Sequence, residues 1–310
     1  MKKGPSEEIL AIKKGFQKLK YICNDQISTA VYLAKALGKP ILIEGPPGVG
    51  KTELANTASL YFKKELYRLQ CYEGLDESKA LYEWRYGKQL LYTQILKEQL
   101  GDVLKGAKGL EDSLGKLMEF EDIFFSEDFL ESRPLLQSLS NKKGSVLLID
   151  EIDKSDEEFE ALLLEILSEF QVSIPELGTI KAVNRPLVFL TSNNSREIGD
   201  ALKRRCLHLY IPFPDAKLER KIVKARVPEL NQNIQKQLVS FVQGLRNLDL
   251  KKVPAISETI DWARTLILLS AEELNEDLAR ETLNLLLKHQ QDIEVSKKEL
   301  PRLIKESTHS

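Results

Sequence analysis

Cysteine and histidine are scarce in this chain of 310 residues, which contains three of each. The cysteines, Cys23, Cys71 and Cys206, are far apart and odd in number. The chain therefore has neither a disulfide framework nor the paired spacing that is typical of a zinc site. We expect the thiols to lie in a core, in a reducing compartment.

An excess of charge of one sign is also missing, because 45 Lys and Arg residues face 47 Asp and Glu residues, for a net charge of −2. This balance gives no global attraction to nucleic acid, although it is compatible with a local basic patch. No apolar run has the length of a membrane span, and residues 1–5 lead into a charged amphipathic segment rather than an apolar signal region. We therefore expect a cytoplasmic protein.

The most informative stretch is residues 41–52, ILIEGPPGVGKT. Its apolar start predicts a buried strand, a glycine-rich turn follows, and a helical pattern resumes after Lys51. This is the phosphate-loop spacing G-x-x-x-x-G-K-[ST], in which backbone N–H groups surround phosphate oxygens. Lys51 is expected to reach the β- and γ-phosphates, and Thr52 to hold Mg²⁺. The nucleotide-binding residues predicted here are Gly45, Pro46, Pro47, Gly48, Val49, Gly50, Lys51, Thr52 and Glu53.

Two further apolar runs end in polar side chains. Residues 146–149 precede Asp150 and Glu151, a Walker-B pattern that places Asp150 near Mg²⁺ and Glu151 near the attacking water. Because consecutive strand residues point in opposite directions, we expect each acid to serve one of these roles. The next buried strand ends in Asn193 and Asn194, whose amides are candidates for contact with the γ-phosphate or that water.

Other patterns predict the surrounding elements. Ser155 and Glu158 form a capping box before a helix, and residues 172–182 predict a β-hairpin. Alternating aromatic residues at 82–86 with Gly87–Lys88 as a turn predict another hairpin, which projects to grip a protein or a nucleic-acid strand. An aromatic cluster covering a helix explains the same residues equally well. Helical periodicity predicts helices at about 6–20, 25–37, 52–62, 216–226, 232–247, 257–270 and 276–290.

The prolines at 212–214 predict a domain boundary. Residues 1–212 are expected to form an α/β nucleotide-binding domain that includes an insertion at about 71–140. Residues 213–310 are expected to be wholly helical, with a poorly ordered tail after Val295. The cations Arg204 and Arg205 either form a solvated surface or reach a neighbouring subunit's phosphates.

With these motifs in this order, the chain resembles an AAA+ ATPase of the MoxR branch. The segments YEGLDE at 72–77, IPELGT at 174–179 and SETIDWAR at 257–264 are most similar to the CoxD-type subgroup, which is accessory to carbon monoxide dehydrogenase. The resemblance implies a P-loop core, with a parallel sheet sandwiched by helices and β-hairpin insertions, followed by a small α-helical lid domain.

The resemblance also implies roles for single residues. Glu151 and Asn193 match the catalytic acid and sensor 1, and Arg205 matches the arginine finger, with Arg204 as the alternative. Arg264 matches sensor 2, which contacts the nucleotide from the lid. Thr52 and Asp150 match the magnesium ligands. The chain departs from the family pattern in one place, where Asp153–Lys154 replaces the Asn–Arg pair common in MoxR proteins. This replacement affects the residues expected to contact Glu151.

The function implied by the resemblance is that of an ATP- and Mg²⁺-dependent homohexameric chaperone. It would remodel or mature a metalloenzyme, for example a molybdenum enzyme, together with a von Willebrand factor A domain protein. Two other classes stay open. The first, a nucleic-acid-dependent NTPase of restriction or motor type, is disfavoured by the near-neutral charge. The second, a nucleotide-gated binding scaffold, is disfavoured by the intact acid pair.

Overall fold

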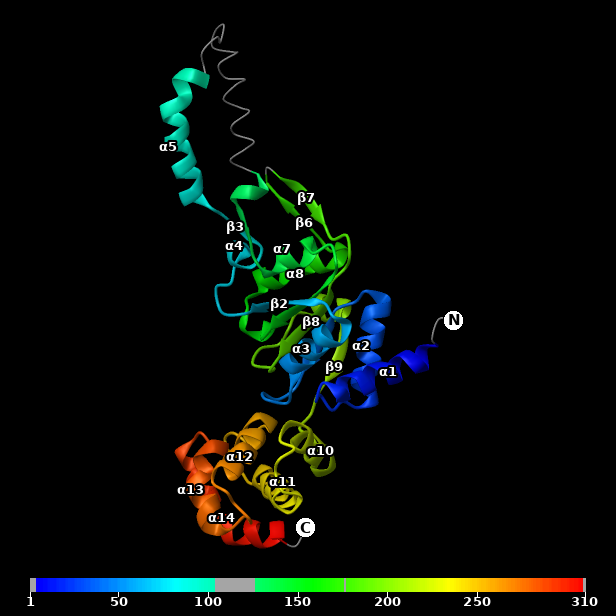
Figure 1. The fold of residues 1–310 in the computed structure, drawn as a ribbon, viewed down its shortest axis with the longest axis vertical. Coiled ribbons are helices and arrows are strands. Elements are labelled where there is room, and N and C mark those ends of the chain that lie inside the picture. Colours follow the sequence, from blue (N-terminus) through cyan, green and yellow to red (C-terminus); the bar gives the residue numbers. More distant parts are fainter. Residues whose placement is uncertain (1–3, 104–125, 176, 309–310) are drawn as a thin grey trace.

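The computed structural model describes residues 4–103, 126–175 and 177–308. Its centre is a five-stranded sheet with the order β2-β5-β8-β1-β9, in which all neighbouring strands are parallel (Figure 1). The polar residues at the carboxyl ends of these strands therefore meet at one edge of the sheet. The strands are β1 (Ile41–Glu44), β2 (Glu65–Gln70), β5 (Ser145–Asp150), β8 (Leu187–Ser192) and β9 (Leu207–Tyr210).

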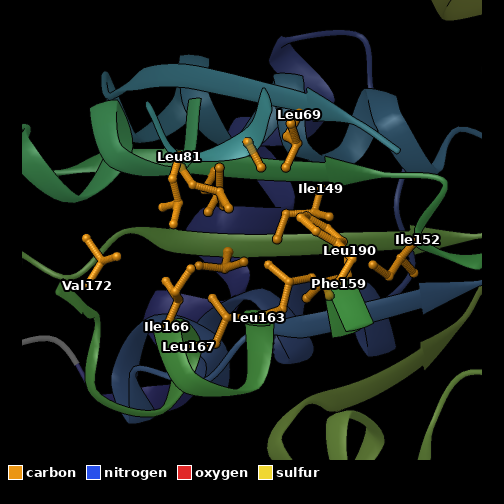
Figure 2. Close-up of a cluster of buried hydrophobic side chains, with 14 of the residues drawn as sticks. Leu69, Leu81, Ile149, Ile152, Phe159, Leu163, Ile166, Leu167, Val172 and Leu190 are labelled. Carbon is orange, nitrogen blue, oxygen red and sulfur yellow. The ribbon is translucent and has the colours of Figure 1, made fainter. Parts of the chain in front are cut away.

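Helices cover both faces of this sheet. One face packs against α1 (Pro5–Lys18), α2 (Asp25–Leu37) and α3 (Lys51–Phe62), through inward residues such as Ile41, Ile43 and Phe189. The other face packs against α7 (Pro134–Ser140), α8 (Glu157–Glu169) and α9 (Asp200–Arg205). Figure 2 shows Ile149 and Leu190 of this second core facing residues of α8. The predicted α/β sandwich is confirmed, because the strand residues alternate between the two cores.

The insertion between β2 and β5 folds differently from the prediction. It contains α4 (Glu77–Ala80), β3 (Tyr82–Trp84), α5 (Tyr86–Val103), the 3-10 turn η1 (Glu127–Phe129) and β4 (Leu130–Ser132). The local hairpin is wrong: Gly87 and Lys88 lie inside α5, and β3 pairs antiparallel with the distant β4. Part of the predicted insertion, residues 104–125, lies outside the described residues. Figure 1 shows α5 projecting away from the sheet.

Two predictions around α8 have different outcomes. The hairpin at 172–182 is confirmed as β6 (Gln171–Ile174) and β7 (Gly178–Lys181). The capping box is wrong, since Asp156 is the N-cap and accepts from Phe159 N at 2.9 Å. Ser155 instead donates to Ile152 O at 2.8 Å, because it closes the 3-10 turn η2 (Ile152–Lys154) that precedes the helix.

The C-terminal region is helical, as predicted, and has a core of its own around Phe241 and Trp262. The expected disorder after Val295 is wrong for the described residues, because Leu300 and Leu303 of α14 are buried in this core. Gly244 lets the last helix approach closely, since a Cβ there would lie 2.6 Å from Leu303 Cδ2. The helices are α10 (Ala216–Arg226), α11 (Gln232–Arg246), α12 (Ile256–Leu268), α13 (Glu276–Leu286) and α14 (Gln290–Thr308). None of the helices in the described ranges is long and apolar enough to cross a membrane.

Candidate nucleotide-binding and catalytic site

The loop between β1 and α3 depends on glycine at close backbone contacts. Gly45 has φ +148°, and a Cβ there would lie 2.2 Å from Ile211 O. Gly48 has φ +73°, and its Cβ would lie 2.4 Å from Ala255 Cβ at the start of α12. A side chain at either position would push the loop away from the segment that it contacts there. The loop leads directly into the first turn of α3, whose unpaired N–H groups favour anions.

Lys51, the first residue of α3, is buried at the mouth of this loop with 6% of its surface exposed. Its Nζ donates to Gly45 O at 2.7 Å, to Pro46 O at 2.8 Å and to Asn193 Oδ1 at 2.7 Å. Burial lowers the pKa of Lys51 to about 8, although the carboxylates of the site oppose this shift. Its three acceptors are neutral, so phosphate oxygens that replace them would give the ammonium group an acceptor of opposite charge.

Asp150 ends β5 and is only 3% exposed. Its Oδ1 accepts from Thr191 Oγ1 at 2.5 Å and from Thr52 Oγ1 at 3.0 Å. The structure thus brings together the two residues predicted to hold Mg²⁺. Their oxygens fit this ion, which usually takes one or two protein ligands in addition to phosphates and water. Among the described residues no group of three His, Cys, Asp or Glu side chains that could hold a metal ion occurs.

Glu151 does not continue the strand, so the expected alternation of the two acids along β5 is wrong. Its φ and ψ are 57° and 50°, in the left-handed region, where a residue with a Cβ is strained by about 1–3 kcal/mol. The turn is held by Glu151 N, which donates to Thr191 Oγ1 at 2.9 Å. The Glu151 carboxylate accepts from Lys154 Nζ at 2.6 Å and from Gln70 Nε2 at 2.9 Å. Its carboxylate therefore lies at the same strand edge as Asp150.

Asn193 lies between Lys51 of the phosphate loop and Glu151. Besides accepting from Lys51, its Nδ2 donates to Glu151 Oε1 at 3.4 Å. Asn194 has φ 58°, and its Oδ1 accepts from Ser192 Oγ at 3.3 Å instead. Of the two amides, Asn193 is therefore the one that contacts both Lys51 and Glu151.

Asp153, the first residue of the pair that departs from the MoxR pattern, holds this loop in place. Its carboxylate accepts from Asn193 N at 3.2 Å, from Ser195 N at 2.9 Å and from Ser195 Oγ at 2.5 Å. Burial by itself would raise the pKa of Asp153, but the hydrogen bonds from Ser195 and Asn193 outweigh it and lower the pKa. The second residue of that pair, Lys154, forms an ion pair with Glu151, and this hydrogen bond raises the pKa of the lysine.

A pocket of about 590 Å³ opens beside the phosphate loop. Its apolar lining includes Tyr21, Ile211 and Phe213, and Gly48–Gly50 of the phosphate loop form one side of it. Arg264 of α12 also lines it, from the C-terminal helices, with a side chain that is 60% exposed. This mixture of apolar walls and a few polar groups is typical of a pocket for a nucleotide base and sugar.

Three site residues escaped the sequence prediction. Arg68 and Gln70 of β2 contact Asp150 and Glu151, and Arg226 of α10 pairs with Glu53 at 2.5 Å across the pocket. Arg68 and Gln70 are two residues apart, so strand periodicity places them on one face. Their roles depend on the sheet order, which puts β2 beside β5.

Arg204 and Arg205 are not part of this cluster within one chain. Both are exposed at the end of α9, and neither lines the pocket or makes a polar contact with the described part of the chain. Their guanidinium groups are therefore available to another molecule.

A family model described as "AAA domain (dynein-related subfamily)" matches residues 40–206. An uncharacterized protein of Staphylococcus epidermidis is 25% identical over 240 residues, which cover 76% of this chain and 78% of the relative. The uncharacterized protein YojN of Bacillus subtilis is 25% identical over 201 residues, which cover 63% of this chain and 54% of YojN.

Among solved structures, the RuvB Holliday junction branch migration motor of Thermotoga maritima is similar, with a TM-score of 0.45, 17% identity, and 88% of this chain and 69% of that chain covered. The family match spans the phosphate loop, the acid pair and Asn193. The chain therefore belongs to the AAA domain family, in its dynein-related subfamily, and is an ATPase.

Proposed function

We propose that this ATPase is a MoxR-type chaperone of the CoxD kind, which remodels or matures a partner metalloenzyme. One observation carries the proposal: the chain combines a cluster of residues suited to ATP hydrolysis with two elements that project away from it. Thr52, Asp150, Glu151 and Asn193 meet at one edge of the sheet. The α5 insertion and the β6–β7 hairpin project at the end of the molecule opposite helices α11–α14 (Figure 1). A machine that acts on other proteins needs such surfaces away from its nucleotide.

The residues of the cluster divide the work of hydrolysis. Lys51 and the loop amides bind the phosphates of ATP, and Thr52 and Asp150 would hold Mg²⁺, which neutralises charge on the β- and γ-phosphates. Glu151 accepts a proton from the attacking water, and Asn193 orients that water. Phosphoryl transfer needs this positioning and charge neutralisation more than covalent chemistry.

We propose that the remaining contacts to the nucleotide come from a lid domain and from a neighbouring subunit. We propose a division into a nucleotide-binding domain, residues 1–212, and a helical lid, residues 213–310, with Arg264 as the lid's contact to the nucleotide. Arg205, with Arg204 as the alternative, would act on the ATP of the next subunit in a homohexamer. Their exposed position and lack of polar contacts to the described residues support this role.

We propose two partners, a client metalloenzyme and a von Willebrand factor A domain protein. For a CoxD-type chaperone the client would be a molybdenum enzyme. The test is capture by the Glu151→Gln variant, which should retain bound ATP because it lacks the acid for hydrolysis. We expect such partners to co-purify with Glu151→Gln in ATP and to be absent with Lys51→Ala, which removes the phosphate contact.

Two results would contradict this proposal. Stimulation of ATPase activity by DNA or RNA, without captured protein, would favour a nucleic-acid-dependent NTPase. A binding scaffold would be favoured if the wild type showed no measurable ATP turnover and captured the same partners in ATP as Glu151→Gln.

A further inference from the structure

The buried carboxylate of Asp150 is neutralised by a side chain that no phosphate-loop pattern includes. Asp150 Oδ2 accepts from both Nη2 and Nε of Arg68, at 2.5 Å and 3.1 Å. The other oxygen, Oδ1, is already engaged by the hydroxyls of Thr191 and Thr52. Since a buried carboxylate is strongly destabilising without a partner, the guanidinium group makes this arrangement stable.

The other cations of the site are engaged elsewhere. Lys51 is held by loop carbonyls and an amide, and Lys154 pairs with Glu151. Within the part of the chain that the structure describes, Arg68 is the side-chain cation that is bonded to Asp150.

Arg68 is also placed so that it can leave. It lies on β2, the edge strand of the sheet, and its side chain is 52% exposed, against 4% for Asp150. The half-exposed guanidinium group regains contacts with water when it turns away from Asp150, which offsets part of the ion pair that it gives up. A second cation on Oδ2 would repel it, because like charges that share one oxygen disfavour each other.

We propose that Arg68 is a positioning residue that neutralises Asp150 in the nucleotide-free protein and must leave Oδ2 before this carboxylate can hold Mg²⁺. The inference rests on the nucleotide site of the proposed function. Arg68 thereby competes with the metal and sets the Mg²⁺ concentration at which the site fills.

The competition extends to the catalytic acid through one further residue. Arg68 Nη2 donates to Gln70 Oε1 at 2.8 Å, and Gln70 Nε2 donates to Glu151 Oε2 at 2.9 Å. When Arg68 leaves, Gln70 loses the donor that orients its amide. Departure of one side chain thus loosens the contacts of both acids.

The test measures binding rather than turnover. Binding of a fluorescent, non-hydrolysable ATP analogue is titrated with Mg²⁺, and also measured in EDTA, for the wild type, Arg68→Gln and Arg68→Lys. For Arg68→Gln we expect the half-saturating Mg²⁺ concentration to fall by about three- to tenfold. Affinity in EDTA should fall by a similar factor, since the uncompensated Asp150 would repel the triphosphate. Arg68→Lys should lie between the two, because it keeps the charge without the two-nitrogen contact.

The matched control is Arg280→Gln, which removes an exposed arginine that pairs with Glu276 on α13. It should leave both measurements unchanged. An unchanged Mg²⁺ requirement in Arg68→Gln, with wild-type binding intact, would overturn the role of Arg68 and leave the nucleotide site standing. Failure of the wild type to bind the analogue would overturn the site itself. If Arg68→Gln does not fold, Arg68→Lys decides the question by the same shift in Mg²⁺ concentration.

Discussion

Lys51 is a cation whose charge depends on pH in the range where the protein can be assayed. Folding lowers its pKa from the usual 10.5 to about 8, because burial disfavours the charged form. The free protein therefore loses this proton as the pH rises through 8, whereas the triphosphate binds the protonated form. Affinity for ATP should thus be fully present below pH 8 and weaken above it.

We predict that the dissociation constant for ATP rises about tenfold between pH 7 and pH 9, because only about a tenth of the Lys51 side chains are protonated at the higher pH. Fluorescence titration with an ATP analogue measures the change. Adenosine, which has no phosphates, serves as the control and should bind equally at both values. Equal ATP affinity at pH 7 and pH 9 would show that Lys51 stays charged in the free protein.

Asp153 gives a second prediction at the scale of one residue. Asp153→Ala removes the acceptor of two backbone N–H groups and of the Ser195 hydroxyl, so the loop that carries Asn193 loses its anchor. We expect a loss of about 1–3 kcal/mol in unfolding free energy. We also expect a fall in kcat of about ten- to hundredfold, since small displacements of positioning groups are costly.

The control for Asp153→Ala is Asp156→Ala, three residues along the chain. Asp156 caps α8 through Phe159 N, so its loss should reduce the unfolding free energy by about 1 kcal/mol. Thermal unfolding and steady-state ATPase assays measure both variants. A kcat that is as high in Asp153→Ala as in Asp156→Ala would separate this loop from catalysis.

Among whole elements, those set by local chemistry were predictable from the sequence. Asn24 accepts from Ile27 N, and Gly38 adopts φ 63°, so both ends of α2 were marked by residue type. The phosphate loop and the strand before Asp150 were equally clear, because their spacing reflects one local geometry. These elements include most of the candidate site.

Elements that depend on distant partners could not be predicted. The pairing of Tyr82 with Ser132 joins two strands that a long insertion separates, and no local pattern encodes it. Arg68 looks like an ordinary cation on an edge strand until β2 is placed beside β5. In α14, Pro301 and many charged residues suggest a disordered tail, yet Leu300 and Leu303 are buried against the other helices. Burial there outweighs the local propensity.

The packing of α10, α11 and α12 depends on one buried carboxylate. Glu219 is fully buried and accepts from both Arg246 Nη1 and Nη2, at 2.7 and 2.8 Å, and from Thr259 Oγ1 at 2.8 Å. Glu219→Ala leaves the Arg246 guanidinium, itself 8% exposed, without its charged partner. We predict a loss of about 3–5 kcal/mol, typical of breaking a buried ion pair from one side.

Urea unfolding followed by the emission of Trp262 measures this loss, because that indole is fully buried in the same helical core. A Trp84→Phe background removes the other tryptophan signal. The control is Glu276→Ala, which breaks an exposed pair with Arg280 and should change the unfolding free energy by at most about 0.5 kcal/mol. Similar losses in the two variants would show that Glu219 contributes no more than a surface pair.

At the scale of the whole molecule, two arginines predicted to act on the nucleotide lie outside the pocket of their own chain. Arg204 and Arg205 end α9 in an exposed position, away from the pocket that Arg264 lines. A ring in which one subunit's arginine completes the next subunit's site would explain this separation. ATPase activity should then rise steeply with protein concentration, and each site would combine residues of two chains.

We predict that two inactive variants restore activity when they are mixed. Arg205→Ala keeps Glu151 but lacks the arginine, and Glu151→Gln has the opposite defect, so a site between them can be complete. Random mixing in equal amounts should make about a quarter of the sites complete in a ring with one type of interface. Steady-state ATPase assays measure this recovery, and Arg204→Ala in place of Arg205→Ala identifies which arginine acts. No recovery from either mixture, with rings still formed, would place the whole hydrolytic site within one chain.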